Sequence, residues 1–294
     1  MKQKTKLTSL AIFLILMSSL SSCALFKGAK GGDAILLNYQ IEKGQSFEMT
    51  SSSSSEIITE QMGQTISIQM ESASKMMGKS LGIQDDNSTR VEFQYNEMSQ
   101  KMTSDMANGD TDYSKIINKL FTLDLGAKGE ITNYGGFNDF PTITNAAGEQ
   151  INGEMFQQGF KVMFLTLPDE PVKVGSTWIQ DVNSELPYGG SVLKTSGTIE
   201  YEIIEKKELD GLPCLVIESH GLLTTSGVFT QQGMEISIDR KNNSQSTIIF
   251  AYTKGLFISS ESSGVTEGIV DIPAANMSIP QTIKVKSSFK VEFK

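Results

Sequence analysis

The feature that most constrains the fold is an alternation of apolar and polar residues with a period of two. Ile66, Ile68 and Met70 show it first, and it returns in many later segments. Because successive side chains of a strand point to opposite faces, this spacing gives strands with one buried and one wet face, as in antiparallel sheets. Turn residues separate the runs, as at Lys43-Gly44 and Asp210-Gly211. The sequence therefore predicts a mainly β protein with large, curved antiparallel sheets in half-barrel form.

A run of five serines, Ser51 to Ser55, carries no apolar alternation. Serine suits the exposed face of a strand, and it also suits a flexible segment. The sequence leaves both interpretations open for this run.

One segment, residues 148–165, has the spacing of a helix instead. Its apolar residues recur at i, i+4, i+7 and i+8: Phe156, Phe160, Met163 and Phe164. Pro168 follows as a stop signal. Gly153 and Gly159 each weaken a helix by up to about 1 kcal/mol relative to alanine. We therefore expect tertiary contacts to hold this helix across the concave face of the sheet.

The central segment, 148–167, divides the chain into a first β-rich half, 35–147, and a second, 168–294. Each half opens with a strand, a lysine, a glycine turn and an aromatic residue, at Tyr39–Phe47 and at Glu170–Trp178. A duplication would explain this likeness, and so would the turn chemistry that all antiparallel meanders share. Both explanations stay open.

The N-terminus has the layout of an export signal. Three lysines precede an apolar run at residues 10–17, and Leu20-Ser21-Ser22-Cys23 follows. The run is too short to span a bilayer. The ending resembles a bacterial lipobox, which implies a signal peptide over residues 1–22, a diacylated Cys23 as the first mature residue, and a tether up to residue 34. Lipid anchoring through several acyl chains would be effectively permanent.

The residues after Cys23 bear on location. By resemblance to Gram-negative sorting rules, Ala24 in place of aspartate favours the outer membrane, and the lack of an acidic cluster after Cys23 favours its periplasmic face. The formal net charge of −9 argues against nucleic-acid binding, since it repels phosphate backbones. With Cys23 acylated, Cys214 has no cysteine to pair with, and its apolar neighbours indicate a small buried residue.

Several short motifs together resemble an uncharacterised family of Gram-negative bacterial lipoproteins of similar length. They are Tyr39–Phe47, Met62-Gly63-Gln64, Lys128–Ile131, Leu167–Trp178 and Tyr201–Ile217. The family has no established activity, so the resemblance implies no catalytic residue. The pattern also resembles periplasmic lipoprotein folds in which helix covers a curved antiparallel sheet. Those folds often bind lipids or other apolar ligands.

Catalytic and metal-binding patterns are weak. His220 is the only histidine, and it stands six residues after Cys214. On one strand that spacing separates them by about 20 Å, too far for a catalytic pair. The oxygen-rich segment Asn108–Asp112 lacks the ligand register and closing glutamate of an EF-hand. We therefore predict no catalytic residues, no metal and no cofactor.

The methionines of the first half are the remaining candidates for binding. Met98 and Met102 share a face under strand or helix periodicity, and thioethers adapt to varied apolar ligands. Core packing and a Cu(I) site are the alternatives. The predicted ligand-binding residues are Met70, Met98, Met102, Phe156 and Phe160. The function we expect is non-enzymatic binding of an apolar ligand such as a lipid; the alternative is an adaptor that docks another envelope protein.

Overall fold

The chain folds as a mainly β protein with one large antiparallel, open sheet and one short α-helix. The computed structural model describes residues 34–61, 63–105, 108–146, 148, 150–161, 163–188, 191–231 and 233–294. Within these residues the large sheet has twelve strands. The predicted signal peptide and Cys23 lie outside the described residues. No helix among the described residues has the length and apolarity to cross a membrane.

The strands of the first part of the chain are β1 (Ser46–Gln61), β2 (Gln64–Ile83), β3 (Thr89–Ser104), β4 (Asn108–Asp110), β5 (Leu120–Leu125) and β6 (Ile131–Gly135). A short insertion follows, with 3-10 helix η3 (Phe137–Asp139), strands β7 (Ile143–Thr144) and β8 (Gln150–Ile151), and helix α1 (Gly153–Phe160). The rest of the chain is β9 (Thr177–Tyr188), β10 (Ser191–Leu209), β11 (Leu212–Gln231), β12 (Met234–Ala251), β13 (Leu256–Ile272), 3-10 helix η4 (Pro273–Ala275) and β14 (Met277–Phe293).

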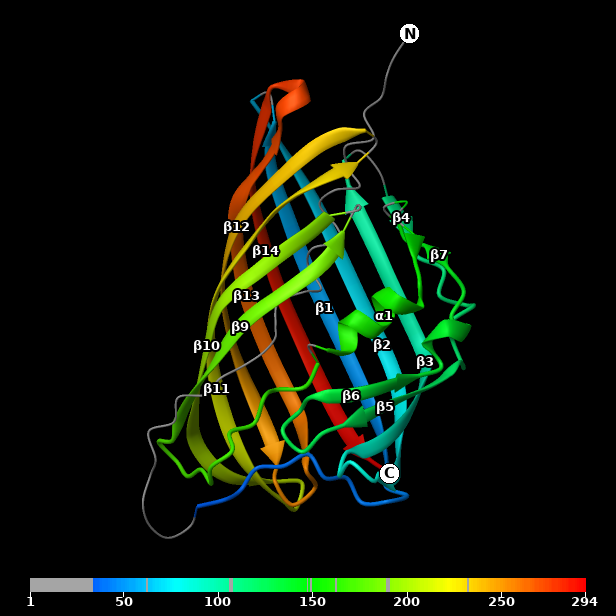
Figure 1. Cartoon of the computed structure of the whole chain (residues 1–294), viewed down its shortest axis with the longest axis vertical. Coiled ribbons are helices and arrows are strands. Elements are labelled where there is room, and N and C mark those ends of the chain that lie inside the picture. The colour runs from blue at the N-terminus through cyan, green and yellow to red at the C-terminus, as the bar shows by residue number, and fades with distance from the viewer. Residues whose placement is uncertain are drawn as a thin grey trace.

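The sheet runs in the order β6-β5-β3-β2-β1-β14-β13-β12-β11-β10-β9, with β4 paired to β3, and β7 pairs with β8 separately. It curves round into a trough that is wide at one end and narrow at the other (Figure 1). This confirms the predicted fold class. Most sheet neighbours are also neighbours in the chain, so a simple meander accounts for the arrangement. A duplication of the two halves stays a prediction.

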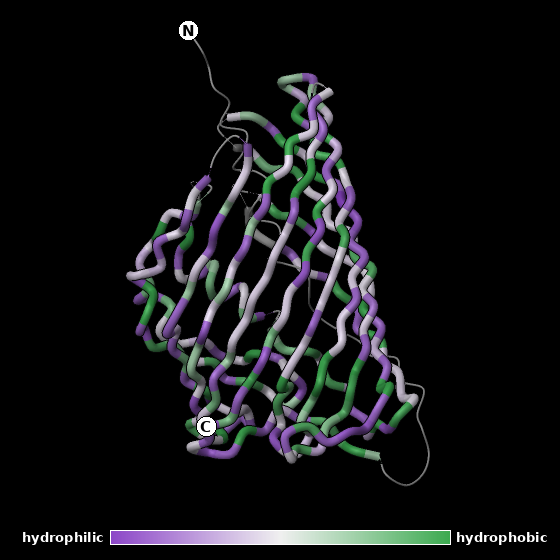
Figure 2. The backbone as a smooth tube through the Cα atoms, turned by 180° about the vertical axis from the view of Figure 1, so that it is seen from behind, coloured by the Kyte–Doolittle hydropathy of each residue, from purple (hydrophilic) through white to green (hydrophobic). Residues whose placement is uncertain are grey.

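The main core fills the wide end of the trough. Inward aromatic side chains of the strands meet those of the insertion there, as where Phe121 packs against Phe93 at 5.6 Å and Phe137 at 4.9 Å between ring centroids. Residues 34–45 cross this end (Figure 1), and the Tyr39 amide donates to the Ala127 carbonyl at 2.9 Å. Figure 2 shows hydrophobic residues gathered at the wide end and paler, more polar stretches along the middles of the strands.

Helix α1 is shorter than the predicted 148–165. Its first turn is capped by Asn152, whose side-chain oxygen accepts a hydrogen bond from the Met155 amide at 3.1 Å. Phe160, the last helical residue, packs on Phe93 of β3, so the helix lies on the concave face as predicted. The chain leaves the helix there because Phe164 contacts Tyr39 and Phe257 in the core of the wide end. The apolar spacing continues past the helix end, which is why the sequence predicted a longer one.

Candidate ligand-binding site

A row of serines crosses the concave face of the sheet at mid-height. The strand register places one inward serine opposite the next over six neighbouring strands, β11, β12, β13, β14, β1 and β2. We call this set the serine row: Ser219, Ser246, Ser262, Ser287, Ser53 and Ser72. Tyr201 of β10 and Gln100 of β3 continue it at its two ends. The row is the polar middle of a face that is apolar at both ends of the trough.

Hydroxyl groups in the serine row bond to each other across the strands. Ser219 pairs with Ser246 at 2.6 Å, and Ser262 pairs with Ser287 at 2.6 Å. These bonds satisfy polar groups that would otherwise be costly to bury. Serine side chains are also short, so the face is not filled at this height. The serine row therefore leaves space inside the trough.

That space is a cavity of about 340 Å³ on the concave face. Four members of the serine row line it, and the segment after α1 contributes a wall of three apolar side chains, Met163, Phe164 and Leu165. Three more residues add apolar surface to the lining: Tyr201 lies level with the serine row, Ile248 lies towards the wide end, and Ile199 lies towards the narrow end. Its volume is near the lower end of the range of small-molecule sites, about 300–1,000 Å³. Its lining can meet both apolar and hydrogen-bonding groups.

The lining of the cavity includes a buried arginine nearer the narrow end. Arg240 of β12 stands opposite Gly268 of β13, which in turn stands opposite Gln281 of β14. The Arg240 side chain passes over Gly268, where a β-carbon would lie 2.6 Å from Cγ of Arg240. It then donates a hydrogen bond to the Gln281 side chain. The lack of a side chain at Gly268 therefore leaves the space that the Arg240 side chain occupies.

Arg240 is the one charged residue of the inward face at the height of the cavity. A cross-strand row is a set of residues that stand opposite each other on neighbouring strands. Four successive inward rows over β10 to β14, β1 and β2 extend from the serine row to the row of Arg240. The other inward residues of these rows, all within the described chain, are apolar, glycine, hydroxyl-bearing or amide side chains. The only other arginine of the sequence, Arg90, lies on the outward face of β3.

The aromatic side of the cavity is ordered by stacking and hydrogen bonding. The rings of Trp178 and Tyr201 stack with their centroids 4.9 Å apart. The Tyr201 hydroxyl donates to Oε1 of Gln180 at 3.0 Å, and the indole N–H of Trp178 donates to the Thr166 carbonyl at 3.1 Å. Burial raises the pKa of Tyr201 well above its ordinary value. Tyr201 is therefore a neutral donor over the physiological pH range.

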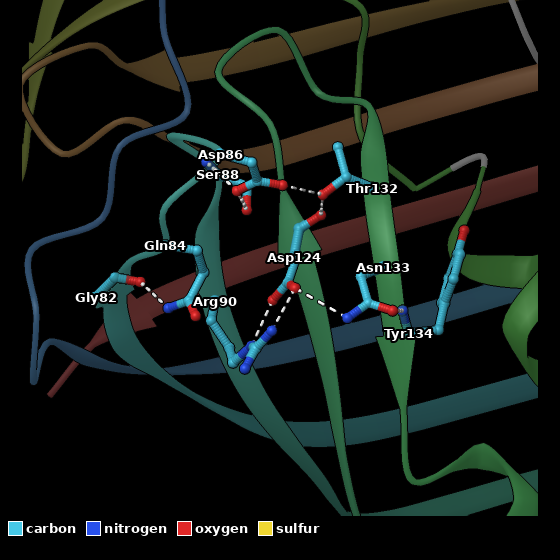
Figure 3. A network of polar contacts seen from close by, with 9 residues as sticks. All are labelled: Gly82, Gln84, Asp86, Ser88, Arg90, Asp124, Thr132, Asn133 and Tyr134. Atoms are coloured by element: carbon cyan, nitrogen blue, oxygen red, sulfur yellow. Dashed lines mark hydrogen bonds and ion pairs between the residues drawn. The ribbon is translucent and has the colours of Figure 1, made fainter.

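A second polar network, on the outward face, ties together β3, β5 and β6 (Figure 3). Asp124 accepts two hydrogen bonds from the Arg90 guanidinium, both at 2.6 Å, and one from Asn133 at 3.2 Å. The Arg90 contact holds the pKa of Asp124 below its ordinary value. Hydrogen bonds from Ser88 likewise lower the pKa of Asp86. Each charge in this network has a partner from the protein, so its role is structural.

Comparison with family models finds a family that covers most of the sheet. Residues 75–257, more than half of the chain, match a family of unknown function, DUF6263. The chain belongs to the DUF6263 family. This agrees with the resemblance to an uncharacterised family, while the DUF6263 match does not show that the protein is a lipoprotein. A comparison with curated proteins finds no match.

Two solved structures align with this DUF6263 protein over most of its length. The β domain of the Bordetella autotransporter BrkA is 6% identical, with 85% of this chain and 99% of that one covered and a TM-score of 0.23. Pseudomonas aeruginosa OccK2 (OpdF), solved in complex with glucuronate, is 8% identical, with 86% and 99% covered and a TM-score of 0.20. Neither likeness is close enough to support an argument.

The five predicted ligand-binding residues lie apart from the cavity. Met70 and Met102 are opposite each other on β2 and β3 and are buried in a small apolar cluster towards the narrow end. Phe156 and Phe160 of α1, and the partly buried Met98, belong to the core of the wide end. The structure thus divides them between two clusters, and the cavity contains a different methionine, Met163.

The residues considered for catalysis and metal binding also lie apart. Cys214 is a free, fully buried cysteine that packs with Ala251 and Ile258, as predicted. His220 is exposed. Among the described residues, no cluster of three or more histidine, cysteine, aspartate or glutamate side chains could hold a metal ion. Sequence reasoning missed the serine row and Arg240 because single strands do not show which residues stand opposite each other.

Proposed function

We propose that this protein is a lipid-anchored binding protein of the bacterial envelope, which holds an amphiphilic, lipid-like ligand without chemical conversion. The observation that carries the proposal is the composition of the cavity: hydroxyl groups of the serine row on the sheet side, and Met163, Phe164 and Leu165 on the other. A ligand with both apolar and hydrogen-bonding parts complements such a lining.

The proposed anchor is a diacylated Cys23, with residues 1–22 removed as a signal peptide. The support is the sequence: a basic start, a short apolar run and the lipobox-like ending. The residues after Cys23 favour the periplasmic face of the outer membrane. An anchored domain would meet its ligand at the membrane surface, where amphiphiles are abundant.

We also propose that the protein does not convert its ligand chemically. Hydrolysis by a serine needs a base within hydrogen-bond reach of the hydroxyl. In the serine row, Ser219 bonds to Ser246 and Ser262 bonds to Ser287, so each of these hydroxyls pairs with another hydroxyl. The pairing supports a binding role for the row.

The test is native mass spectrometry of the full-length protein released from cell membranes. We expect the wild type to retain a lipid-sized adduct. Ser246→Leu fills the cavity and should lose the adduct, whereas Thr247→Leu places the same side chain on the outward face of the same strand and should keep it. Equal adducts in both variants, or none in the wild type, would contradict the proposal. A co-purifying envelope protein in place of lipid would favour the adaptor alternative.

A further inference from the structure

The hydrogen-bonding groups of the cavity indicate which head group an amphiphilic ligand would carry. Apart from Arg240, every polar side chain among the described lining residues is a hydroxyl or an amide, and no carboxylate is among them. Arg240 is engaged by groups of the protein, Gln281 among them. The lining therefore does not require a charged ligand, and its other polar side chains suit an uncharged head group.

A hollow in the floor of the cavity lies at Gly264 of β13. Ser262 and Thr266, two positions away on the same strand, stand on either side of it and face inward like the glycine. Ser244 of β12 stands directly opposite, with Asn242 two residues before it. A β-carbon at Gly264 would lie 3.3 Å from Cβ of Ser244 and 3.6 Å from Nδ2 of Asn242. The missing side chain therefore leaves a depression bordered by three hydroxyl groups and one amide.

Asn242 lines the cavity and has an acceptor atom without a donor. Its amide N–H donates to Oγ1 of Thr266 at 2.8 Å, whereas its Oδ1 is buried and accepts no hydrogen bond from the described residues. A buried acceptor without a donor is costly. A ligand hydroxyl seated against Asn242 can supply the donor, whereas a carboxylate or a phosphate dianion has no proton to give and would be repelled.

The paired serines next to the hollow supply further donors and acceptors. Ser219 pairs with Ser246, and Ser262 pairs with Ser287. In each pair one O–H donates to the other oxygen, so the second O–H is not used by the pair, and a serine oxygen also accepts through two lone pairs. The hydroxyls of a sugar or of glycerol have the same double character. Several of them can therefore bond to the serine row at once.

We propose that the cavity binds an amphiphile with an uncharged, polyhydroxyl head such as a sugar, with the head over Gly264 and the chain against Ile248 and Phe164. This inference rests on the proposed function and specifies its ligand class. From Asn242 to Ile248 the inward side chains of β12 change from an amide through two hydroxyls to an apolar group, which is the order from head to chain. A strand rises about 3.4 Å per residue, so this stretch spans about 20 Å, enough for a sugar ring and a short alkyl chain end to end.

The test compares three ligands with the same octyl chain: octyl glucoside, its 6-phosphate, and a methyl-capped octyl tri(ethylene glycol) ether, which accepts hydrogen bonds but donates none. Each is titrated below its critical micelle concentration into full-length protein on vesicles of neutral phosphatidylcholine, with protein-free vesicles as the blank. The fluorescence of Trp178, the only tryptophan, reports binding because its ring stacks on Tyr201 of the lining. Compared with the glucoside, the 6-phosphate should bind the wild type at least about tenfold more weakly, and the capped ether about three- to tenfold more weakly.

Two neighbouring asparagines of β12 provide matched variants. Asn242→Leu removes the inward amide and should reduce the preference for the glucoside over the capped ether. Asn243→Leu makes the same change at the next residue, which is exposed on the outward face, and should keep the wild-type preference. If Asn242→Leu does not fold, Asn242→Asp keeps an acceptor at the same place. It should keep the preference for the glucoside over the capped ether and weaken binding of the 6-phosphate further, because like charges repel.

The results separate this inference from the proposed function. Equal wild-type affinity for the three ligands, or a preference for the 6-phosphate, would overturn the inference and leave the proposed function standing. An unchanged preference in Asn242→Leu would overturn the placement of the head group. Glucose alone should bind far more weakly than octyl glucoside, and equal binding would show a site for free sugar and overturn the inference too. Failure to bind any of the three amphiphiles would instead overturn the proposed function.

Discussion

At the scale of single residues, the contact between Arg90 and Asp124 has the geometry of a strong ion pair. Two parallel hydrogen bonds of 2.6 Å join them, and the Asp124 side chain is only 6% exposed. Asp124→Asn should lower the free energy of unfolding by about 2 kcal/mol at pH 7, because the buried carboxylate is the charged acceptor of both Arg90 hydrogen bonds. Urea unfolding measures the change. The double variant Arg90→Met/Asp124→Asn should then lose less free energy of unfolding than the two single variants lose together, because each single variant already breaks the same contact.

The same pair predicts a pH dependence. The pKa of Asp124 is lower in the folded protein than in the unfolded chain, mainly because of its hydrogen bonds with Arg90. Its stabilisation is therefore complete above the unfolded value of about 3.9 and is lost as the pH falls through the folded value. The stability difference between wild type and Asp124→Asn should be constant above about pH 5 and shrink below about pH 4. A difference that does not change with pH would contradict this account.

Cys214 provides a test of burial. Its side chain is inaccessible, and burial raises the pKa of its thiol, so little reactive thiolate is present in the folded protein. An aromatic disulfide reagent should react with the native protein at least about a hundredfold more slowly than with the chain in denaturant. Acylated Cys23 would not contribute to the signal. Rapid labelling under native conditions would mean that β11 and β12 separate easily near Cys214 and Ala251.

At the scale of elements, helix α1 contains two glycines with opposite surroundings. A β-carbon at Gly159 would meet nothing within 4 Å, whereas one at Gly153 would lie 1.9 Å from the Phe137 carbonyl oxygen. Gly159→Ala should stabilise the protein by about 0.5–1 kcal/mol, through helix propensity and a less flexible unfolded chain. Gly153→Ala should destabilise it by about 1–3 kcal/mol, through overpacking. Thermal unfolding of the two variants measures both signs. A stabilised Gly153→Ala would show that α1 packs differently on η3.

The elements also show how far the sequence was informative. The alternation at Ile66, Ile68 and Met70 predicted the strand and its buried face, because hydropathy alone decides which side of such a strand meets the core. The run Ser51–Ser55 was ambiguous, since its residues are all alike. In the structure it is part of β1, with Ser53 facing inward and Ser54 outward. What decides this is the register of β1 with β2 and β14, which depends on residues far away in the chain.

The candidate site was less predictable than the strands, because it too depends on the register between strands that are far apart in the chain. Phe160 was correctly expected on the concave face, because a helical apolar stripe must pack against something apolar. The serine row exists only where six strands align, and Arg240 has polar neighbours in the sequence that resemble an exposed strand face. Its burial follows from Gly268, which stands opposite it and lies 28 residues away, and from Gln281, which lies one strand further on and 41 residues away. No local pattern contains that information.

At the scale of the whole molecule, the two β-rich halves share one core. Phe164, in the segment between them, contacts Tyr39 from the first half and Phe257 from the second. Tyr39 also packs directly on Phe250 of β12. The pairing of β1 with β14 joins the halves again across the sheet. Separating the halves would therefore expose apolar surface and break a complete strand ladder.

This predicts that the chain unfolds in one cooperative transition, although chains of this size often unfold in stages. Trp178 is the only tryptophan, so its fluorescence reports on the second half, and hydrogen exchange of β2 and β3 reports on the first. The two probes should give the same urea midpoint. Phe164→Ala should lower both midpoints together, by about 3–5 kcal/mol in free energy, because it removes a ring that both halves contact. Separate midpoints would show that residues 35–147 and 168–294 are independent units, and would favour an origin by duplication over a single continuous meander.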